Sequence, residues 1–325
     1  MQIPKISPID KSVWQNAQSR FDRLIKPVGS LARLEEITCL YAAARKTGEI
    51  TEPGKALLVF LSDHGAAADD REEKNATAAF RESILAGKHA LNVLANTVGA
   101  SIVEVFPGGE GTKRSGDIRR RPALSESDFT AAFQAGRAAA QSAGAAGAGV
   151  IGLGHYGGGA ALSQAALMSM FFGERFAQTL ALDERELLAQ VFSFHGALDK
   201  NDLPGLVRRL GGWEMPAMIG SILQAASMGM PVFLDGLATF VAAFVAAGLR
   251  PPVGDYLIAV SSLEDAGQNI LLTQLGLSIM LDLKLHSPAG EASLLGFQIL
   301  SAGIKAFNEM DSFGRDTVHH PLGDI

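Results

Sequence analysis

Short apolar runs of β-favouring residues alternate along this chain with longer, alanine-rich runs of helical pattern. The apolar runs lie at residues 56–61, 101–106, 149–153, 231–234 and 256–260. They are apolar at successive positions, which is typical of strands covered by helices on both faces of a sheet. Most of them are followed by Gly, Asp or Ser and then by a helical pattern. This alternation predicts an α/β fold with a doubly wound, mostly parallel sheet and helices on both faces.

The composition fits a folded core and argues against nucleic acid as a partner. The 325 residues are 47% hydrophobic and 19% charged, whereas disordered chains combine low hydrophobicity with high charge. The dense basic run is confined to Arg119-Arg120-Arg121, although binding to a phosphate backbone requires clustered Lys and Arg. The apolar stretch 230–249 contains Asp235, so we interpret it as a buried strand and a buried helix rather than a membrane span.

Cysteine usage and the first residues indicate the compartment. The single cysteine, Cys39, excludes an internal disulfide and a cysteine-rich metal site, which fits a reducing environment. The N-terminal residues lack the apolar stretch of a signal peptide. We therefore expect a cytoplasmic protein.

The chain divides into three segments of different pattern. Residues 1–50 and 291–325 show helical patterns without intervening strands, and we expect them to pack together as a small helical cap domain. Residues 51–290 contain all the predicted strands and would form the parallel-sheet domain with the active-site cleft.

Polar or glycine-rich residues follow every predicted strand. In parallel sheets, ligands bind beyond the carboxyl ends of the strands. The sequence therefore predicts a cleft along this edge of the sheet. The segments that would line it are residues 62–65, 107–111, 154–159, 235–236 and 261–262.

Residues 152–157 form a GxGxxG pattern between a strand and a helix. Glycines there let a phosphate approach the backbone, and a helix N-terminus supplies amide donors. Three interpretations stay open: a phosphate or nucleotide monophosphate site, a dinucleotide site, and glycines required by close packing. A dinucleotide site also needs an acidic residue at a strand end about twenty residues later. This sequence lacks such a residue, and we expect no cofactor.

Asp63 and His64 directly follow the first predicted strand. They can hold a polar ligand, or Asp63 can cap the next helix, and both interpretations stay open. One His and one Asp are too few ligands for a metal site. The other histidines show no HExxH spacing. The sequence therefore predicts no catalytic metal.

Two further segments have the pattern of helix starts. Residues 26–35 predict a turn, an N-cap at Ser30 and then a helix. Residues 287–293 contain Pro and Gly and place Glu291 in or just before the first turn of an apolar helix. A carboxylate is favourable there because of the helix dipole. Glu291 is thus either an ordinary helix-start residue or a functional acid.

Together, several short segments resemble the nicotinate-nucleotide:dimethylbenzimidazole phosphoribosyltransferase family. Residues 26–35 are similar to the family's KPPGSLG-x-LE, residues 63–65 to its DHG, and residues 211–214 to its GG-x-E. The similarity is collinear from about residue 20 to residue 313. It implies phosphoribosyl transfer from nicotinate mononucleotide to a 5,6-dimethylbenzimidazole-like or phenolic base. The products would be α-ribazole phosphate and nicotinate, in assembly of the cobalamin lower ligand.

Among the departures of this sequence from the family, two concern the motifs that carry the family's acidic residues. Residues 154–161 are similar to GEMGIGNTT, but the family's Glu is replaced by His155, and its Asn and Thr are replaced by alanines. The family's base motif, RLGEG-x-GA, aligns without gaps to residues 286–294, which places Ala289 at the base position. A shift of two residues places Glu291 there instead. Both alignments stay open.

The resemblance implies roles for particular residues. Glu291 would be the catalytic base. The remaining substrate contacts would come from the glycine loop and from polar residues of the cleft, namely Asp63, His64, His155, Gly157, Gly158, Gly159, Asp235, His286 and Gly290. The implied partners are nicotinate mononucleotide and an aromatic base, and the implied assembly is a homodimer or a hetero-oligomer with a related subunit.

Two other functions stay open. The substitutions at the family motifs favour a non-catalytic or weakly active paralogue that binds nucleotide or base, or that supports an active partner subunit. The GxGxxG pattern taken alone is typical of a nicotinamide dinucleotide oxidoreductase.

Overall fold

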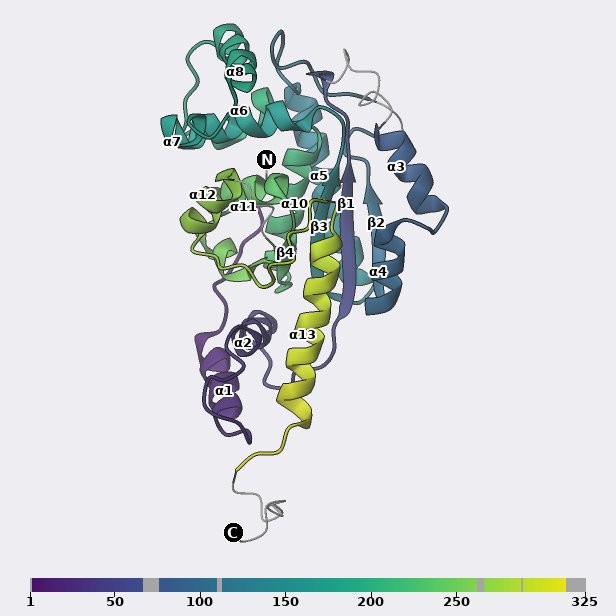
Figure 1. The fold of residues 1–325 in the computed structure, drawn as a ribbon, viewed down its shortest axis with the longest axis vertical. Coiled ribbons are helices and arrows are strands. Elements are labelled where there is room, and N and C mark those ends of the chain that lie inside the picture. The colour runs from purple at the N-terminus through teal and green to yellow at the C-terminus, as the bar shows by residue number, and fades with distance from the viewer. Residues whose placement is uncertain (1, 67–75, 110–112, 262–265, 288, 314–325) are drawn as a thin grey trace.

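The computed structural model describes residues 2–66, 76–109, 113–261, 266–287 and 289–313 (Figure 1). Within them, five parallel strands form one sheet in the order β2-β1-β3-β4-β5. The predicted α/β fold class is confirmed. The strands are β1 Gly54–Leu61, β2 Ala100–Val105, β3 Ala148–Tyr156, β4 Val232–Leu234 and β5 Leu257–Ala259.

All five predicted strands form, but the end of β3 differs from the expectation. The sequence pattern ends this strand at Leu153, whereas β3 continues to Tyr156. The reason is the neighbouring strand, because Val59 and Phe60 of β1 pair with Gly154 and His155. His155 therefore belongs to the sheet and not to the loop that follows it.

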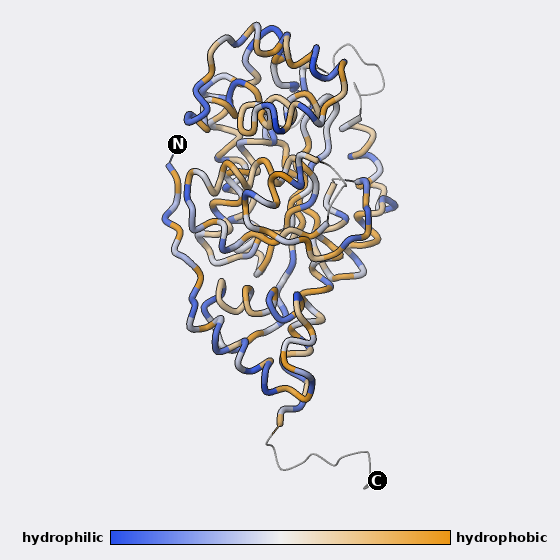
Figure 2. Tube along the Cα trace, turned by 60° about the vertical axis from the view of Figure 1, so that its left-hand side comes forward, coloured by the Kyte–Doolittle hydropathy of each residue, from blue (hydrophilic) through white to orange (hydrophobic). Residues whose placement is uncertain are grey.

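Successive residues of the central strands point into two different cores. Ala56, Leu58 and Phe60 of β1 lie in one cluster of buried hydrophobic residues. Leu57 and Val59 lie in the other. This alternation across a strand follows from the pleat. Figure 2 shows hydrophobic segments gathered in the middle of the molecule.

Helices cover both faces of the sheet. One face packs against α5 and α10, and the opposite face packs against α13. Further helices contact α11 and extend that side. The helices are α1 Lys11–Asp22, α2 Arg33–Arg45, α3 Ala76–Leu85, α4 Ala90–Val98, α5 Glu126–Ala145, α6 Ala160–Phe172, α7 Glu174–Ala177, α8 Leu182–His195, α9 Leu203–Leu210, α10 Glu214–Ser227, α11 Leu237–Leu249, the 3-10 helix η3 Pro251–Tyr256, α12 Ala266–Leu275 and α13 Glu291–Glu309. None of these helices has the length and apolar character needed to cross a membrane.

The helices near the two ends of the chain lie side by side at one end of the molecule (Figure 1). Phe21 of α1 contacts Phe307 of α13 with ring centroids 5.2 Å apart. Arg20 Nε also donates a hydrogen bond to the carbonyl oxygen of Phe307 at 2.8 Å. The same helix α13 contacts the sheet with its other end. The division of the chain at residues 50 and 290 stays a prediction.

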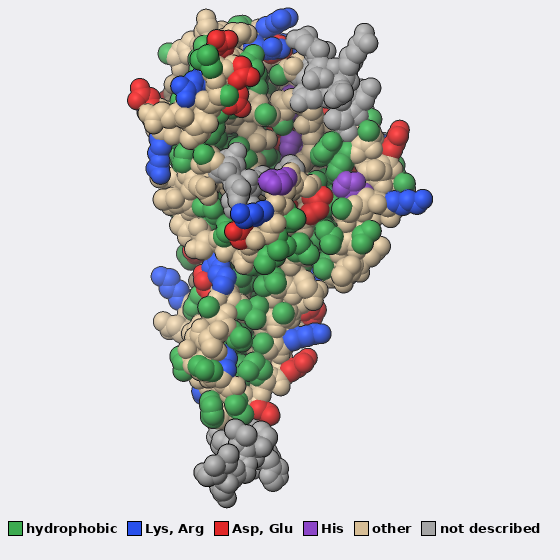
Figure 3. Space-filling model, in the orientation of Figure 1, with side chains coloured by type: hydrophobic (Ala, Val, Ile, Leu, Met, Phe, Trp, Pro, Cys, Tyr) green, Lys and Arg blue, Asp and Glu red, His purple; other side chains and the backbone are tan. Residues whose placement is uncertain are grey.

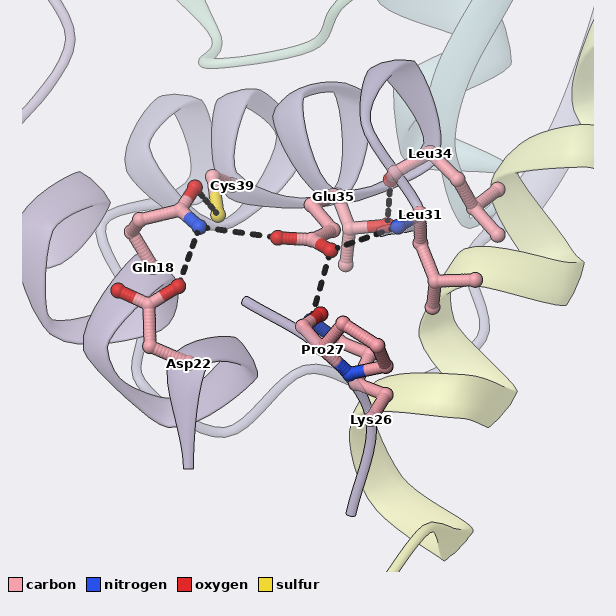
Figure 4. Close-up of polar contacts among 9 residues, drawn as sticks. Gln18, Asp22, Lys26, Pro27, Leu31, Leu34, Glu35 and Cys39 are labelled. Atoms are coloured by element: carbon pink, nitrogen blue, oxygen red, sulfur yellow. Dashed lines mark hydrogen bonds and ion pairs between the residues drawn. The ribbon is translucent and has the colours of Figure 1, made fainter. Parts of the chain in front are cut away.

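A buried ion pair organises the segment that precedes α2 (Figure 4). Lys26 Nζ lies 2.8 Å from Glu35 Oε1, and both side chains are almost completely buried. The Glu35 carboxylate also accepts hydrogen bonds from Leu31 N and from Gln18 Nε2, each at 3.0 Å. Burial alone would raise the pKa of Glu35, but the hydrogen bonds from Lys26 and Gln18 outweigh burial and lower it.

The prediction of an N-cap at Ser30 is wrong. Helix α2 begins at Arg33, and its N-cap residue is Ala32, with φ of 42°. The amide of Ser30 is used instead in a turn, where it donates to the carbonyl oxygen of Pro27 at 3.1 Å. Local residue preference is overridden here by the turn and by the buried Glu35, which binds the Leu31 amide.

Candidate active site

Asp63 connects the carboxyl ends of β1 and β3. Its Oδ1 accepts a hydrogen bond from the amide of Gly158 at 3.0 Å and another from the hydroxyl of Thr77 in α3. The amide of His64 donates in return to the carbonyl oxygen of Gly158 at 2.9 Å. These bonds hold the loop between β3 and α6 against the end of β1.

Close packing accounts for the GxGxxG pattern. A Cβ atom on Gly154 would lie 1.9 Å from the carbonyl oxygen of Ala289, and one on Gly157 would lie 1.6 Å from that of Ser62. A Cβ atom on Gly152 would be similarly close to α13. The glycines thus let α13 lie against β3 and let the loop approach β1. Of the three interpretations, the packing one is supported at these positions.

Two histidines and a glutamate meet behind the strand ends. His64 Nε2 lies 3.2 Å from Glu214 Oε1, and the hydroxyl of Ser62 donates to Glu214 Oε2 at 2.6 Å. Ligand atoms of His64, His155 and Glu214 all lie within 4.8 Å of one another. All three side chains are buried. On the face drawn in Figure 3, a few other, exposed histidine side chains are visible in the upper half of the molecule, whereas His64 and His155 are buried.

Burial and the neighbouring charges shift the pKa values of these groups in opposite directions. Burial alone would raise the pKa of Glu214, but the charge and hydrogen bond of His64 outweigh it and lower the pKa to about 2. Burial lowers the pKa of His155, which keeps its imidazole neutral at pH 7. The centre therefore holds an ionised carboxylate next to an uncharged imidazole.

The first turn of α13 is fixed at the ends of β3 and β4. Asp235 follows β4, and its Oδ2 accepts a hydrogen bond from the amide of Ala292 at 2.9 Å. The hydroxyl of Ser293 contacts the carbonyl oxygens of Leu153 and Phe233 at 3.3 and 3.2 Å. Burial raises the pKa of Asp235 to about 7, and the negative charge of Glu291 also raises it.

Glu291 lies in this turn and is only 7% exposed. Its Oε2 has no hydrogen-bond partner within the described parts of the chain. Gly290 precedes it with φ of 120°, and a Cβ atom there would lie 2.5 Å from Leu57 Cδ1. Ala289 is also buried, but it contacts β3 through its backbone. The acid is thus held at the strand ends by glycine-dependent packing.

Two pockets flank the strand ends, and both contain cationic side chains. The first lies at the start of α6 and is lined by Ala66, Arg119, Gly159, Ala161, Leu162, Ala165, Glu184 and Leu187. The second lies at the ends of β1 and β2 and is lined by Leu61, Ser62, Asp63, Thr77, Ala78, Arg81, Phe106, Gly108, Gly109 and Lys113. Arg119 also forms an ion pair with Asp117 at 2.9 Å.

The residues expected at the site fall into two groups and one outlier. Asp63, His64, His155 and the glycine loop 157–159 come together at the ends of β1 and β3. Asp235, Gly290 and Glu291 come together at the start of α13. His286 lies on the segment before α13, and its side chain is exposed.

The fold brings two further residues to this edge, Glu214 and Arg119, to which the sequence patterns assigned no role in the site, although Glu214 ends the family-like segment 211–214. Glu214 is completely buried and begins α10, a helix whose other residues carry no charge. A lone carboxylate in an otherwise uncharged helix is a usable signal, since such a group is seldom buried without a partner. Arg119 was visible only as part of a basic run.

A family model described as phosphoribosyltransferase matches residues 6–318. The chain belongs to this phosphoribosyltransferase family. Its members transfer a pentosyl group, so this phosphoribosyltransferase is an enzyme of the glycosyltransferase class. The resemblance seen in the sequence motifs is confirmed.

The sequences of named relatives align with nearly the whole length of this phosphoribosyltransferase. The nicotinate-nucleotide–dimethylbenzimidazole phosphoribosyltransferase of Roseiflexus sp. strain RS-1 is 30% identical over 341 residues, covering 96% of this chain and 95% of the relative. The enzyme of that name from Geobacter metallireducens is 28% identical over 338 residues, with 96% and 95% covered. A crystal structure of the Thermus thermophilus enzyme superposes with a TM-score of 0.84 at 26% identity, covering 94% of this chain and 98% of that one.

Proposed function

We propose that this phosphoribosyltransferase transfers the phosphoribosyl group of nicotinate mononucleotide to a 5,6-dimethylbenzimidazole-like or phenolic base in cobalamin lower-ligand assembly. The products are α-ribazole phosphate, or its phenolic counterpart, and nicotinate. The observation that carries the proposal is the buried carboxylate of Glu291 at the ends of the same parallel strands that bear the glycine loop. The names of the relatives support the choice of substrates.

For this reaction the protein must position the donor and the acceptor and must supply one base. The pyridinium nitrogen of the donor leaves with the bonding electrons as neutral-ring nicotinate, while a nitrogen or phenol oxygen of the acceptor attacks the anomeric carbon from the opposite side. The acceptor then loses one proton. Positioning can supply about 7 to 11 kcal/mol, and a placed base contributes about 10² to 10⁴-fold in rate.

Glu291 is the proposed base. Its position next to Asp235 places two acids at the start of α13, and one oxygen of Glu291 has no partner among the described residues. An acceptor nitrogen or oxygen can donate its proton to that oxygen. Ala289 cannot serve because it has no ionisable group.

The proposed phosphate site is the start of α6. Gly159 is the N-cap of this helix with φ of 75°, and Gly159 and Arg119 line the same pocket. Amide groups at a helix N-terminus and a guanidinium both favour a phosphate. The amide of Gly158 is already bound by Asp63, so the cradle would use the amides that follow it.

The test is turnover of nicotinate mononucleotide and dimethylbenzimidazole by Glu291→Gln, followed by chromatography of the products. We expect kcat to fall by about 10² to 10⁴-fold, the contribution of a placed base. Glu309→Gln is the matched control, because this glutamate is exposed at the other end of the same helix. Unchanged turnover by folded Glu291→Gln would refute the assignment of the base.

A second candidate function is a non-catalytic paralogue that binds nucleotide or supports a related subunit. The observation in its favour is that His155, Ala160 and Ala161 replace the polar residues of the family motif. Calorimetry with nicotinate mononucleotide, followed by the product assay with a panel of benzimidazoles and phenols, separates the two functions. Binding without product favours the paralogue.

A further inference from the structure

We propose that His64, His155 and Glu214 bind one divalent transition-metal ion of the zinc class, through the two Nε2 atoms and Glu214 Oε1. Their ligand atoms lie within 4.8 Å of one another, and the residues come from the end of β1, from β3 and from the start of α10. The inference does not rest on the proposed transfer reaction, because metal binding can be measured on the protein alone.

The separations between the ligand atoms fit such an ion. Zinc binds histidine nitrogen and carboxylate oxygen at about 2.0 to 2.2 Å in tetrahedral geometry, which places neighbouring ligand atoms roughly 3.3 Å apart. The distance from His64 Nε2 to Glu214 Oε1 is 3.2 Å. The other separations in the set are within 4.8 Å, a range that small movements of the side chains can close onto one ion.

A second observation, independent of the distances between ligand atoms, is that a ring nitrogen of His155 is buried without a partner. Its side chain is 3% exposed, and Nε2 has no hydrogen-bond partner within the described residues. Burying a polar atom without a partner is costly. A bound metal ion would satisfy this nitrogen.

The surroundings hold the other two ligands in place. The hydroxyl of Ser62 binds Glu214 Oε2 at 2.6 Å, which leaves Oε1 facing His64. The backbone of His64 is fixed by its bond to Gly158. Hydrogen bonds from outside the ligand set orient metal ligands in this way and raise their affinity.

Gly212 packs directly against His64 and Glu214. A Cβ atom on Gly212 would lie 2.6 Å from His64 Nε2 and 2.2 Å from Glu214 Oε2, so a larger residue at this position would fill the centre. Three protein ligands with an open fourth position are typical of catalytic zinc sites, where water or an oxygen of a ligand takes that position.

The donor set selects the class of metal. Two imidazoles and one carboxylate suit zinc and its first-row neighbours, whereas magnesium and calcium prefer all-oxygen sites. Glutamate stands at the position of His155 in the family motif that this sequence resembles. The second imidazole is therefore a property of this chain's own sequence.

The experiment is a titration of the full chain with Co²⁺, after treatment with a chelator, followed by visible absorption. We expect one equivalent to bind with the intense bands of four-coordinate cobalt and to be displaced by one equivalent of Zn²⁺. His155→Phe should weaken binding by at least about a hundredfold, since even loss of an outer partner costs about 10- to 100-fold. His195→Phe is the matched control, because this histidine bonds the carbonyl oxygen of Ile118 outside the cluster.

Two results would overturn the proposal: a wild-type chain that binds no stoichiometric cobalt or zinc, or His155→Phe and His195→Phe binding the metal equally well. Circular dichroism checks that each variant is folded. If His155→Phe does not fold, Glu214→Gln and the wild-type titration decide the question. Loss of activity in Glu291→Gln with intact cobalt binding would separate the transfer reaction from the metal site.

Discussion

Asp235 is the residue on which the start of α13 depends most directly. Its carboxylate binds the Ala292 amide at 2.9 Å while being almost completely buried. Burial of a carboxyl group favours its protonated form, and the pKa of Asp235 is accordingly raised to about 7. The proton on this side chain therefore links the stability of the site to pH.

The expected consequence is a loss of stability as the pH rises toward 7. Between the unfolded pKa of 3.8 and the folded pKa of about 7, the folded state binds more protons than the unfolded state. The stabilisation is thus complete below the unfolded pKa and is lost as the pH passes through the folded pKa. Asp235→Asn should flatten this dependence, measured as the urea midpoint across the interval between those two pKa values. Parallel curves for variant and wild type would contradict the prediction.

Gly154 shows why the contact between β3 and α13 tolerates no side chain. The carbonyl oxygen of Ala289 occupies the place that a Cβ atom would need. At the level of the element, the strand is thus in backbone contact with the two residues that directly precede the helix that carries Glu291. Glycine is unfavourable in the interior of a strand. Its presence at position 154 is therefore explained by the close approach of the Ala289 backbone and not by a preference of glycine for strands.

Gly154→Ala should destabilise the protein by about 1 to 3 kcal/mol or more, as expected for overpacking in a core. It should also lower turnover, since it displaces the helix that bears Glu291. The measurements are the urea midpoint and kcat. Gly48→Ala is the control, because nothing lies within 4 Å of a Cβ atom at that glycine. Equal urea midpoints for the two variants would contradict the prediction, because they would mean that the backbone around Gly154 accommodates a Cβ atom without loss of stability.

The ion pair between Lys26 and Glu35 holds the segment between α1 and α2. Because both side chains are buried, removal of one charge leaves the other without its partner in the protein interior. Helix α2, which contains Glu35, also carries an ion pair at the surface, Arg33 with Glu36. Solvent screens the charges of this second pair. The two pairs allow a direct comparison of buried and exposed charge.

Lys26→Met should lower the free energy of unfolding by about 3 to 5 kcal/mol, the usual cost of breaking a buried pair. Glu36→Gln should change it by less than about 1 kcal/mol. Both values can be measured by chemical denaturation at neutral pH. A small effect of Lys26→Met would mean that the hydrogen bonds from Gln18 and Leu31 alone keep the Glu35 carboxylate stable.

At the scale of the whole molecule, α13 connects the site to the helices near the chain ends. Its first turn binds Asp235 and the ends of two strands, and its last turns contact α1 through Phe307. A helix that packs on both parts couples their unfolding. The two predicted domains should therefore unfold together.

Phe307→Ala tests this coupling far from the site. Its ring is 4% exposed, and removal of a buried phenylalanine costs about 3 to 5 kcal/mol. We expect a single transition at lower temperature, with loss of secondary structure and loss of activity coinciding. Two separated transitions would contradict the coupling. Light scattering on the same samples tests the predicted homodimer.

Local sequence was sufficient for the elements of this fold. Five apolar runs became five strands, since hydrophobic period and the residues that end a run are visible over a few positions. The acids and glycines at the strand ends were visible for the same reason. The end of β3 and the start of α2 could not be predicted locally, because the neighbouring strand and the buried Glu35 determine them.

The arrangement of the site was decided only by the tertiary structure. Positions 64, 155 and 214 are far apart in the sequence and meet because β1 and β3 are neighbours and α10 begins beside them. Likewise, the glycines of the GxGxxG pattern look like a phosphate loop in the sequence, whereas in the fold α13 and the residues just before it lie against two of them. Contacts between distant residues depend on strand order and helix placement, and no short-range pattern records either.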